Sequence, residues 1–160
     1  MKRPSLPAVL AMALTLAAAA QPVAAQSAAP RTVLPGTAPL GSDDRLYTEL
    51  GGRDNIQRFT DDFYDRMLQD ERIARYFDGI NIRHLKRVLA DYFCVVAGGP
   101  CVYDGVGMKE AHAHLGIDRA AFNALVEQLQ GAMSDAGVPF GAQNRLLARM
   151  ASFHRDIVTR

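Results

Sequence analysis

The stretch MKEAHAHLGI, residues Met108–Ile117, places His112 and His114 two positions apart, shortly before a glycine. Side chains two residues apart point in different directions on a helix, so the two histidines are a poor clamp for a single metal ion. The cysteines do not help, because Cys94 and Cys101 are seven residues apart and form no Cys-x-x-Cys or Cys-x-x-Cys-His motif. The stretch therefore offers one functional histidine at most, and the rest of the chain has to identify it.

Outward from this stretch, apolar residues recur at spacings of three and four, which predicts amphipathic helices. Asn81 and Asp118 stand where helix caps are favoured, and Gly98-Gly99-Pro100 is a strong break. No strand pattern is present, so the fold class is all-α, with antiparallel helices joined by short loops. The expected inward faces are Ile56, Phe59, Phe63 and Met67; Leu85, Val88, Leu89, Tyr92, Phe93 and Val96; Phe122, Leu125, Val126, Leu129 and Met133; and, on one last helix, Leu146, Leu147, Met150, Phe153 and Ile157.

The first 25 residues have the pattern of a secretory signal peptide, with Lys2 and Arg3, an apolar run and a small-residue end at Val23-Ala24-Ala25. The apolar run of about 13 residues is short for a membrane span, which needs roughly 20, although an uncleaved anchor is the alternative. Residues 26–41 read as a flexible linker rich in Ala, Pro, Thr and Gly. We therefore expect a folded domain over residues 42–160, exported to the periplasm and free of the membrane after cleavage.

Net charge argues against one class of partner, and the two cysteines suggest a disulfide. The formal net charge of +1 gives no basic stripe, so nucleic acid is not an expected partner. Cys94 and Cys101 bracket the glycine turn, and exported proteins meet an oxidising compartment. A disulfide here would stabilise the fold by roughly 2–3 kcal/mol on the chain-entropy estimate, and two free thiols are the alternative.

Five features, in this order and at these spacings, resemble the group I truncated haemoglobins. Each alone is weak, but together they are specific, and the match covers nearly all of residues 46–157 in the same order. The resemblance implies a shortened globin, a two-over-two helical sandwich around non-covalent haem b and its iron. The features are LYTELGG, FTDDFYDRML, RYFDG, the Gly98-Gly99 break and MKEAHAHLGI.

The resemblance also assigns residues. The family's proximal histidine follows its methionine by four positions, which makes His112 the iron ligand and leaves His114 a solvated neighbour. One neutral imidazole on the proximal side leaves the opposite face of the iron open for a gas. The family's Asp-Phe-Tyr pattern makes Tyr64 the distal hydrogen-bond donor. Phe77 matches a residue that packs on the haem face, and Phe93 and Met108 match further wall positions.

The chain departs from the pattern on the distal helix. Where many relatives carry glutamine, this sequence has Leu85 and Leu89, so Tyr64 would act alone in a more apolar pocket. His84 is expected to point outward and His154 lies beyond any haem motif. Lys86 and Arg87 could reach haem propionates, but a solvated helix face is the simpler interpretation.

These features predict reversible binding of dioxygen, carbon monoxide or nitric oxide at the iron, and thus an oxygen-binding or carrier protein. The alternative is an enzyme, a nitric oxide dioxygenase that converts nitric oxide to nitrate with bound dioxygen. That chemistry would need an external reductase, because the chain has no reductase domain of its own. A helical interaction module without haem is a third possibility.

Overall fold

The computed structural model describes residues 45–160, and every regular element among them is helical, which confirms the all-α prediction. The predicted signal peptide (1–25) and linker (26–41) lie outside the described residues, as do the first three residues of the predicted domain. No helix in the described part of the chain has the length and apolar character needed to cross a membrane. The elements are α1 (Arg45–Glu49), α2 (Gly52–Gln69), the 3₁₀ turn η1 (Ala74–Phe77), α3 (Ile82–Val96), α4 (Met108–His112), α5 (Arg119–Asp135), α6 (Phe140–Met150), η2 (Ala151–Phe153) and α7 (His154–Ile157).

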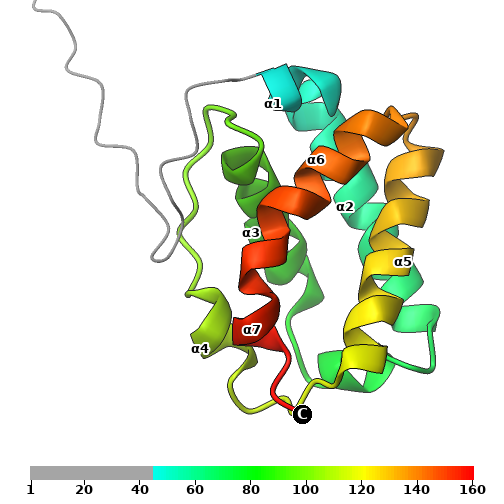
Figure 1. Cartoon of the computed structure of the whole chain (residues 1–160), viewed down its shortest axis with the longest axis vertical. Helices are drawn as coiled ribbons and strands as arrows, with labels where there is room; N and C mark the ends of the chain where they lie inside the picture. The colour runs from blue at the N-terminus through cyan, green and yellow to red at the C-terminus, as the bar shows by residue number, and fades with distance from the viewer. Residues whose placement is uncertain (1–44) are drawn as a thin grey trace, which may run out of the picture. The chain divides into compact units, whose positions relative to one another are not determined.

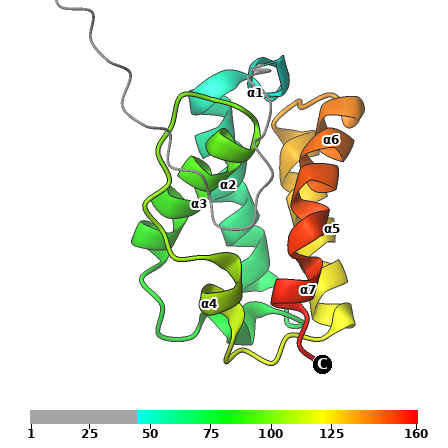
Figure 2. The same ribbon diagram turned by 60° about the vertical axis from the view of Figure 1, so that its left-hand side comes forward.

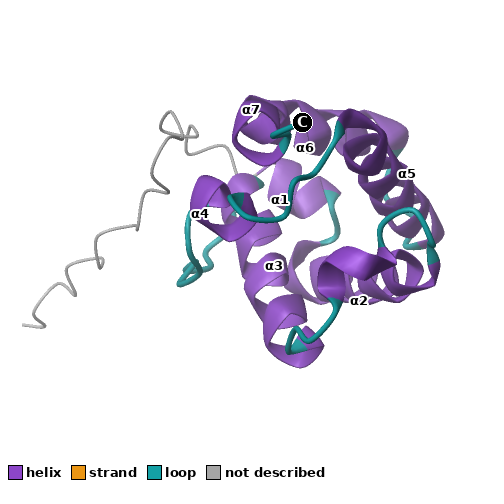
Figure 3. Ribbon diagram, turned by 90° about the horizontal axis from the view of Figure 1, so that it is seen from below, coloured by secondary structure: helices purple, strands orange, loops and turns teal. Residues whose placement is uncertain are grey.

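The four longest helices form two layers (Figures 1 and 2). One layer holds α2 and α3, and the other holds α5 and α6. Helix α2 packs against both α3 and α5 and so joins the layers. Viewed from below, the short α4 lies beside α7, away from α2 (Figure 3). This is the two-over-two arrangement that the sequence resemblance predicts.

Both predicted caps are present. The Asn81 side chain accepts a hydrogen bond from the backbone N–H of His84 at 3.2 Å and begins α3. The Asp118 side chain accepts one from the backbone N–H of Ala121 at 2.8 Å and begins α5. Each cap satisfies a donor that a helix start otherwise leaves without a partner. The local sequence therefore fixes where α3 and α5 begin.

The end of α3 depends on a glycine. Gly98 has a φ of +87°, a left-handed conformation that L side chains rarely adopt. It lets the backbone N–H of Gly99 turn back and donate to the Cys94 carbonyl oxygen at 2.8 Å. The turn brings the chain back alongside α3, where Cys94 and Cys101 form a disulfide. The predicted bond is thereby confirmed and the alternative of two free thiols is excluded.

The predicted inward face of α2 forms the centre of the core. Ile56, Phe59, Phe63 and Met67 are all at most 2% exposed. The Phe59 ring meets that of Phe93 on α3 with centroids 5.6 Å apart. Burying each such side chain contributes about 1.5–3 kcal/mol, so this face supplies much of the force that holds α2 between its two partners.

The last predicted helix is wrong in one respect. The apolar spacing predicts one helix through Ile157, whereas the chain tightens into η2 after α6 and continues as α7. A tertiary contact lies at the break: Arg149 donates to the Val96 carbonyl oxygen at the end of α3 at 2.8 Å. The tighter turn buries Phe153 against Tyr92, with ring centroids 6.1 Å apart. Periodicity alone does not reveal this change because both helix types continue the same apolar face.

Candidate functional site

An apolar cavity of about 590 Å³ lies between the layers. Its wall comes from α2, η1, α3, α4, α5, the end of α6 and the segment after it, together with the loops on either side of α4. Among the residues that the structure describes, no Asp, Glu, Lys or Arg lines it. A cavity of this size and character suits a largely apolar ligand held by a few polar groups.

Every residue predicted for the site lines this cavity. They come from four separate elements, so only the fold brings them together. The wall positions on α3 are half-buried or buried and face the same space as the histidine of α4. The residues are Tyr64, Phe77, Leu85, Leu89, Phe93, Met108 and His112.

His112 closes the five-residue helix α4 and is half-buried. Its Nδ1 lies 2.7 Å from the carbonyl oxygen of Met108. A carbonyl oxygen only accepts, so Nδ1 carries a proton, and in the neutral ring Nε2 then keeps its lone pair. A neutral imidazole held in this tautomer is the form that binds a metal, and the hydrogen bond also orients the ring. His114, by contrast, is exposed, as the sequence predicts.

Tyr64 stands on α2 and lines the same cavity as the histidine of α4. Its side chain is 3% exposed, and its ring meets Phe77 edge-on with centroids 5.9 Å apart. Burial, and to a lesser extent the proximity of Tyr103, raises the pKa of the Tyr64 hydroxyl well above its usual value. The hydroxyl therefore stays protonated at neutral pH. No group in the described part of the chain pairs with it, so it is available as a donor.

The charged side chains between Leu85 and Leu89 on α3 form ion pairs and do not line the cavity. Lys86 pairs with Asp65 on α2, with Nζ and Oδ1 2.7 Å apart. Arg87 reaches Asp91 and Asp104 at 3.4 and 3.5 Å. His84 is exposed, as predicted. These contacts support the solvated-face interpretation of Lys86 and Arg87 and leave the wall at Leu85 and Leu89 apolar.

The cavity contains polar residues that the sequence-based site omits, among them His154, Tyr103 and Tyr92. His154 was placed beyond any haem motif, but it lines the cavity and packs edge-on against Phe122, with centroids 4.7 Å apart. Tyr103 lines it from the loop before α4. Tyr92 follows Leu89 by one helical step of three residues, a spacing that could have placed it on the same wall. Its hydroxyl is buried without a hydrogen-bond partner.

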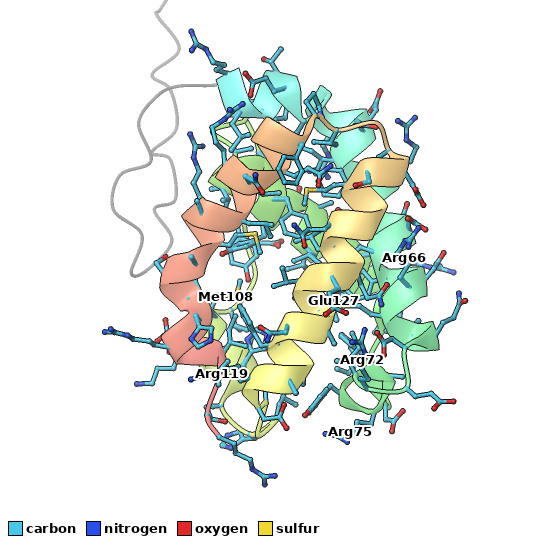
Figure 4. The ribbon with its side chains drawn as sticks, turned by 45° about the vertical axis from the view of Figure 1, so that its right-hand side comes forward. Arg66, Arg72, Arg75, Met108, Arg119 and Glu127 are labelled. Carbon is cyan, nitrogen blue, oxygen red and sulfur yellow. A yellow bond between two sulfur atoms is a disulfide. The ribbon has the colours of Figure 1, made fainter. Side chains whose placement is uncertain are left out.

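The donor set fits a haem better than a metal ion bound by protein ligands alone. The described residues hold no cluster of three or more His, Cys, Asp or Glu side chains that could bind an ion. They do provide one imidazole of the right tautomer in an apolar wall large enough for a flat macrocycle. Figure 4 shows Met108 between α7 and α5, whereas Arg66, Arg72 and Glu127 lie on the opposite side of α5. Those charged groups are thus separated from the cavity.

Known proteins resemble this chain along most of its described length. The family model for bacterial-like globins matches residues 45–159. A group 1 truncated haemoglobin of Mycolicibacterium paratuberculosis is 32% identical over 114 residues, which cover 71% of this chain and 84% of the relative. A group 1 truncated haemoglobin of Tetrahymena pyriformis is 30% identical and is covered over 98% of its length, against 74% of this chain.

Solved structures agree. The crystal structure of the Tetrahymena pyriformis truncated haemoglobin in its Fe(III) form superposes with a TM-score of 0.69 at 26% identity, covering 72% of this chain and 98% of that one. The 2/2 haemoglobin of a Synechococcus species superposes with a TM-score of 0.66 over the same shares of the two chains. At 24% identity, the latter supports the fold alone.

Two helical layers around an apolar cavity with one oriented imidazole define a haem-binding globin. The family match and the relatives of at least 30% identity show which kind of globin it is. The chain belongs to the bacterial-like globin family, as a group 1 truncated haemoglobin. Its cofactor is haem iron, and its general function is the binding of gases at that haem.

Proposed function

We propose that this protein binds dioxygen reversibly at a haem b iron ligated by His112. The observation that carries the proposal is the His112 ring, which is fixed by the Met108 carbonyl so that Nε2 is free for a metal inside an apolar cavity. Tyr64 supplies a protonated, unpaired hydroxyl in the same cavity. Together they provide one ligand and one donor, as a five-coordinate gas-binding haem requires.

Each residue has a separate task in this proposal. The haem iron supplies the coordination chemistry, and the protein sets its surroundings. His112 would hold the iron through Nε2 while its Nδ1–H stays with Met108. The Tyr64 hydroxyl would serve as the hydrogen-bond donor to a gas held there. Leu85 and Leu89 keep water away from that face, because they offer no polar group.

A second candidate is nitric oxide dioxygenase activity, which the apolar wall favours. With leucines at both positions, the distal helix adds no amide to restrain dioxygen beside the Tyr64 hydroxyl, and this largely apolar wall would admit a second nonpolar gas. Turnover to nitrate would consume electrons, which an external reductase would have to supply. Carbon monoxide and nitric oxide are further ligands under either proposal.

The test of haem ligation is the absorption spectrum of the ferrous protein with and without carbon monoxide. We expect a five-coordinate ferrous spectrum that changes on adding the gas. The His112→Ala variant should lose this five-coordinate spectrum. His114→Ala is the matched control, because His114 is two residues away and exposed. A wild-type spectrum in His112→Ala would overturn the assignment of the ligand.

Rapid mixing of the oxygenated protein with nitric oxide separates the two functions. Fast, stoichiometric formation of ferric protein and nitrate supports the dioxygenase. Slow conversion, at rates well below those of gas binding, supports reversible binding alone. The measurement needs only single turnover, so it does not depend on knowing the reductase.

We also propose that the protein acts outside the cytoplasm, in the periplasm. The signal-like residues 1–25 support this, as does the Cys94–Cys101 bond, since disulfides persist in oxidising compartments. N-terminal sequencing of the exported protein should find a start near Gln26. A mature chain that still begins at Met1 would contradict the proposal.

A further inference from the structure

The connection between α3 and α4, residues 97–107, carries the chain from the distal wall to the proximal histidine. Helix α4, which follows this connection, has five residues, and none of them is buried. A helix of that length is not stable by itself in water. The position of His112 therefore depends on what holds the segments on either side of α4.

The connection is fastened to the rest of the fold by several independent contacts. The disulfide ties Cys101 to Cys94, which is buried on α3. Arg53 on α2 donates to the Cys101 sulfur at 3.4 Å and pairs with Asp91 on α3 at 2.5 Å. Further along, Asp104 lies 3.5 Å from Arg87 of α3. The disulfide is the only covalent contact among those named here, and it lies nearest the start of the connection.

The connection also forms part of the cavity. Tyr103 lines the wall and meets Tyr92 edge-on, with ring centroids 5.5 Å apart. Its hydroxyl donates to the Val106 carbonyl oxygen at 2.6 Å, which stiffens the loop around it. A side chain at Gly105 would collide with the Tyr103 ring and with Val88, so the loop lies directly against α3. A shift of Cys101 would move this wall and the start of α4 together.

We propose that the Cys94–Cys101 disulfide is a positioning element for haem binding, which holds His112 and Tyr103 in place so that haem retention is coupled to the redox state of the two cysteines. The proposal rests on the proposed ligation of iron by His112. Reduction requires two equivalents of an external thiol such as glutathione: the protein S–S bond breaks, two cysteine thiols form, and the two glutathione thiols leave as oxidised glutathione. Because the coupling is an equilibrium, bound haem must in turn favour the disulfide over the dithiol by the same factor.

A bond that merely stabilised the fold would behave differently. It would lower the unfolding midpoint when removed but leave the iron–histidine bond of the folded protein unchanged. A positioning role predicts a change in that bond and in haem retention while the protein is still folded. The decisive readouts are therefore spectroscopic and kinetic, and they do not require a measurement of activity.

The first experiment measures haem loss from the ferric holoprotein to an excess of apomyoglobin. We expect Cys94→Ser/Cys101→Ser to lose haem roughly tenfold faster than wild type, the lower end of the effect of removing a group that orients a metal ligand. Arg72→Gln is the matched control, because it removes contacts to Asp70 and Glu127 that are remote from the connection. Equal rates in the double variant and wild type would overturn the proposal.

The second experiment records the iron–histidine stretching band of the ferrous protein by resonance Raman spectroscopy. We expect the band to shift and broaden in the double variant, as the ring loses a single orientation. If the variant does not fold, wild type is reduced with a phosphine under carbon monoxide, which keeps the iron ferrous. The carbon monoxide is then removed before the band is recorded. An unchanged band after two thiols have appeared would refute the positioning role.

The reciprocal effect is measured on the same holoprotein. In a glutathione redox buffer, the carbonmonoxy protein should require a more reducing ratio to open the bond than His112→Ala loaded with haem, in which the iron–histidine bond is missing. Identical opening ratios would contradict the coupling. If His112→Ala retains the wild-type spectrum, the proposed ligation fails instead, so the two failures are distinguishable.

Discussion

At the scale of single residues, the site depends on which hydroxyls have partners. Tyr103 donates to Val106, whereas the Tyr92 hydroxyl is buried without a partner, and Tyr64 lines the cavity. A buried donor without a partner costs about 1–3 kcal/mol. Under the proposed function, the Tyr64 hydroxyl would find its acceptor in a bound gas. For Tyr92, which is walled by Tyr103 and Phe153, no such partner is evident.

Tyr64→Phe should release dioxygen faster. Losing one donor to a partly negative oxygen removes about 1.4 kcal/mol, so the dissociation rate should rise about tenfold. Stopped-flow displacement of dioxygen by carbon monoxide measures it. Tyr47→Phe, on α1 and outside the cavity wall, is the control. An unchanged rate in Tyr64→Phe would remove Tyr64 from the role of distal donor.

Tyr92→Phe should stabilise the protein. The change deletes a hydroxyl that is buried without a partner and keeps the ring contacts, so the free energy of unfolding should rise by about 1 kcal/mol. Tyr103→Phe should lower it by a similar amount, because that hydroxyl is hydrogen-bonded. Urea titration of the two variants compares them directly. Destabilisation by Tyr92→Phe would show that its hydroxyl has a partner after all.

At the scale of elements, the starts of α3 and α5 are set by side chains that act on their own backbone. Asp118 begins α5, whose inward face supplies Phe122, Leu125 and Leu129 to the cavity. The cap thereby fixes the register of one whole wall. Helix α4 has no such cap and depends on its neighbours.

Asp118→Ala should cost about 1 kcal/mol of stability, the usual effect of losing an N-cap. Asp118→Asn should cost much less, because the amide oxygen can accept the same bond from Ala121. Chemical denaturation of both variants gives the comparison. Equal losses would indicate that the charge of Asp118 matters more than its hydrogen bond.

At the scale of the whole molecule, Asp70 links the end of α2 to α5. Its carboxylate accepts hydrogen bonds from the Arg72 side chain and backbone N–H and from Gln128, and Arg72 continues to Glu127. The Arg72 hydrogen bond is the main reason that the pKa of Asp70 lies well below its usual value. A carboxyl with a lowered pKa contributes stability that is fully present above the unfolded-state pKa of about 4 and is lost as the pH falls further.

Asp70→Asn should therefore flatten the acid limb of stability. The wild type loses stability below about pH 4 because the unfolded chain takes up a proton at this carboxyl and the folded protein does not, whereas the variant has no carboxyl to protonate. Urea midpoints between about pH 2 and 7 measure the slope. Asp78→Asn, at an exposed position, is the control and should follow wild type. Matching acid limbs for Asp70→Asn and wild type would contradict the link.

The sequence by itself determined the features that depend on neighbours along the chain. The spacing of Phe59, Phe63 and Met67 defines a buried helix face, and Asn81 and Asp118 cap helices through their own backbone. The order of short motifs pointed to one histidine of the pair and to the family. These signals are local, because helix periodicity and capping act within a few residues.

The tertiary structure alone decided which distant residues share the cavity. His154 enters the wall because η2 re-aims the chain after Arg149 binds the end of α3, and Tyr103 enters it where its ring packs on Tyr92 of α3. Neither effect leaves a periodic trace in the sequence. Contacts between residues about 50 positions apart form only when the layers pack, and packing depends on the shapes of all the faces at once.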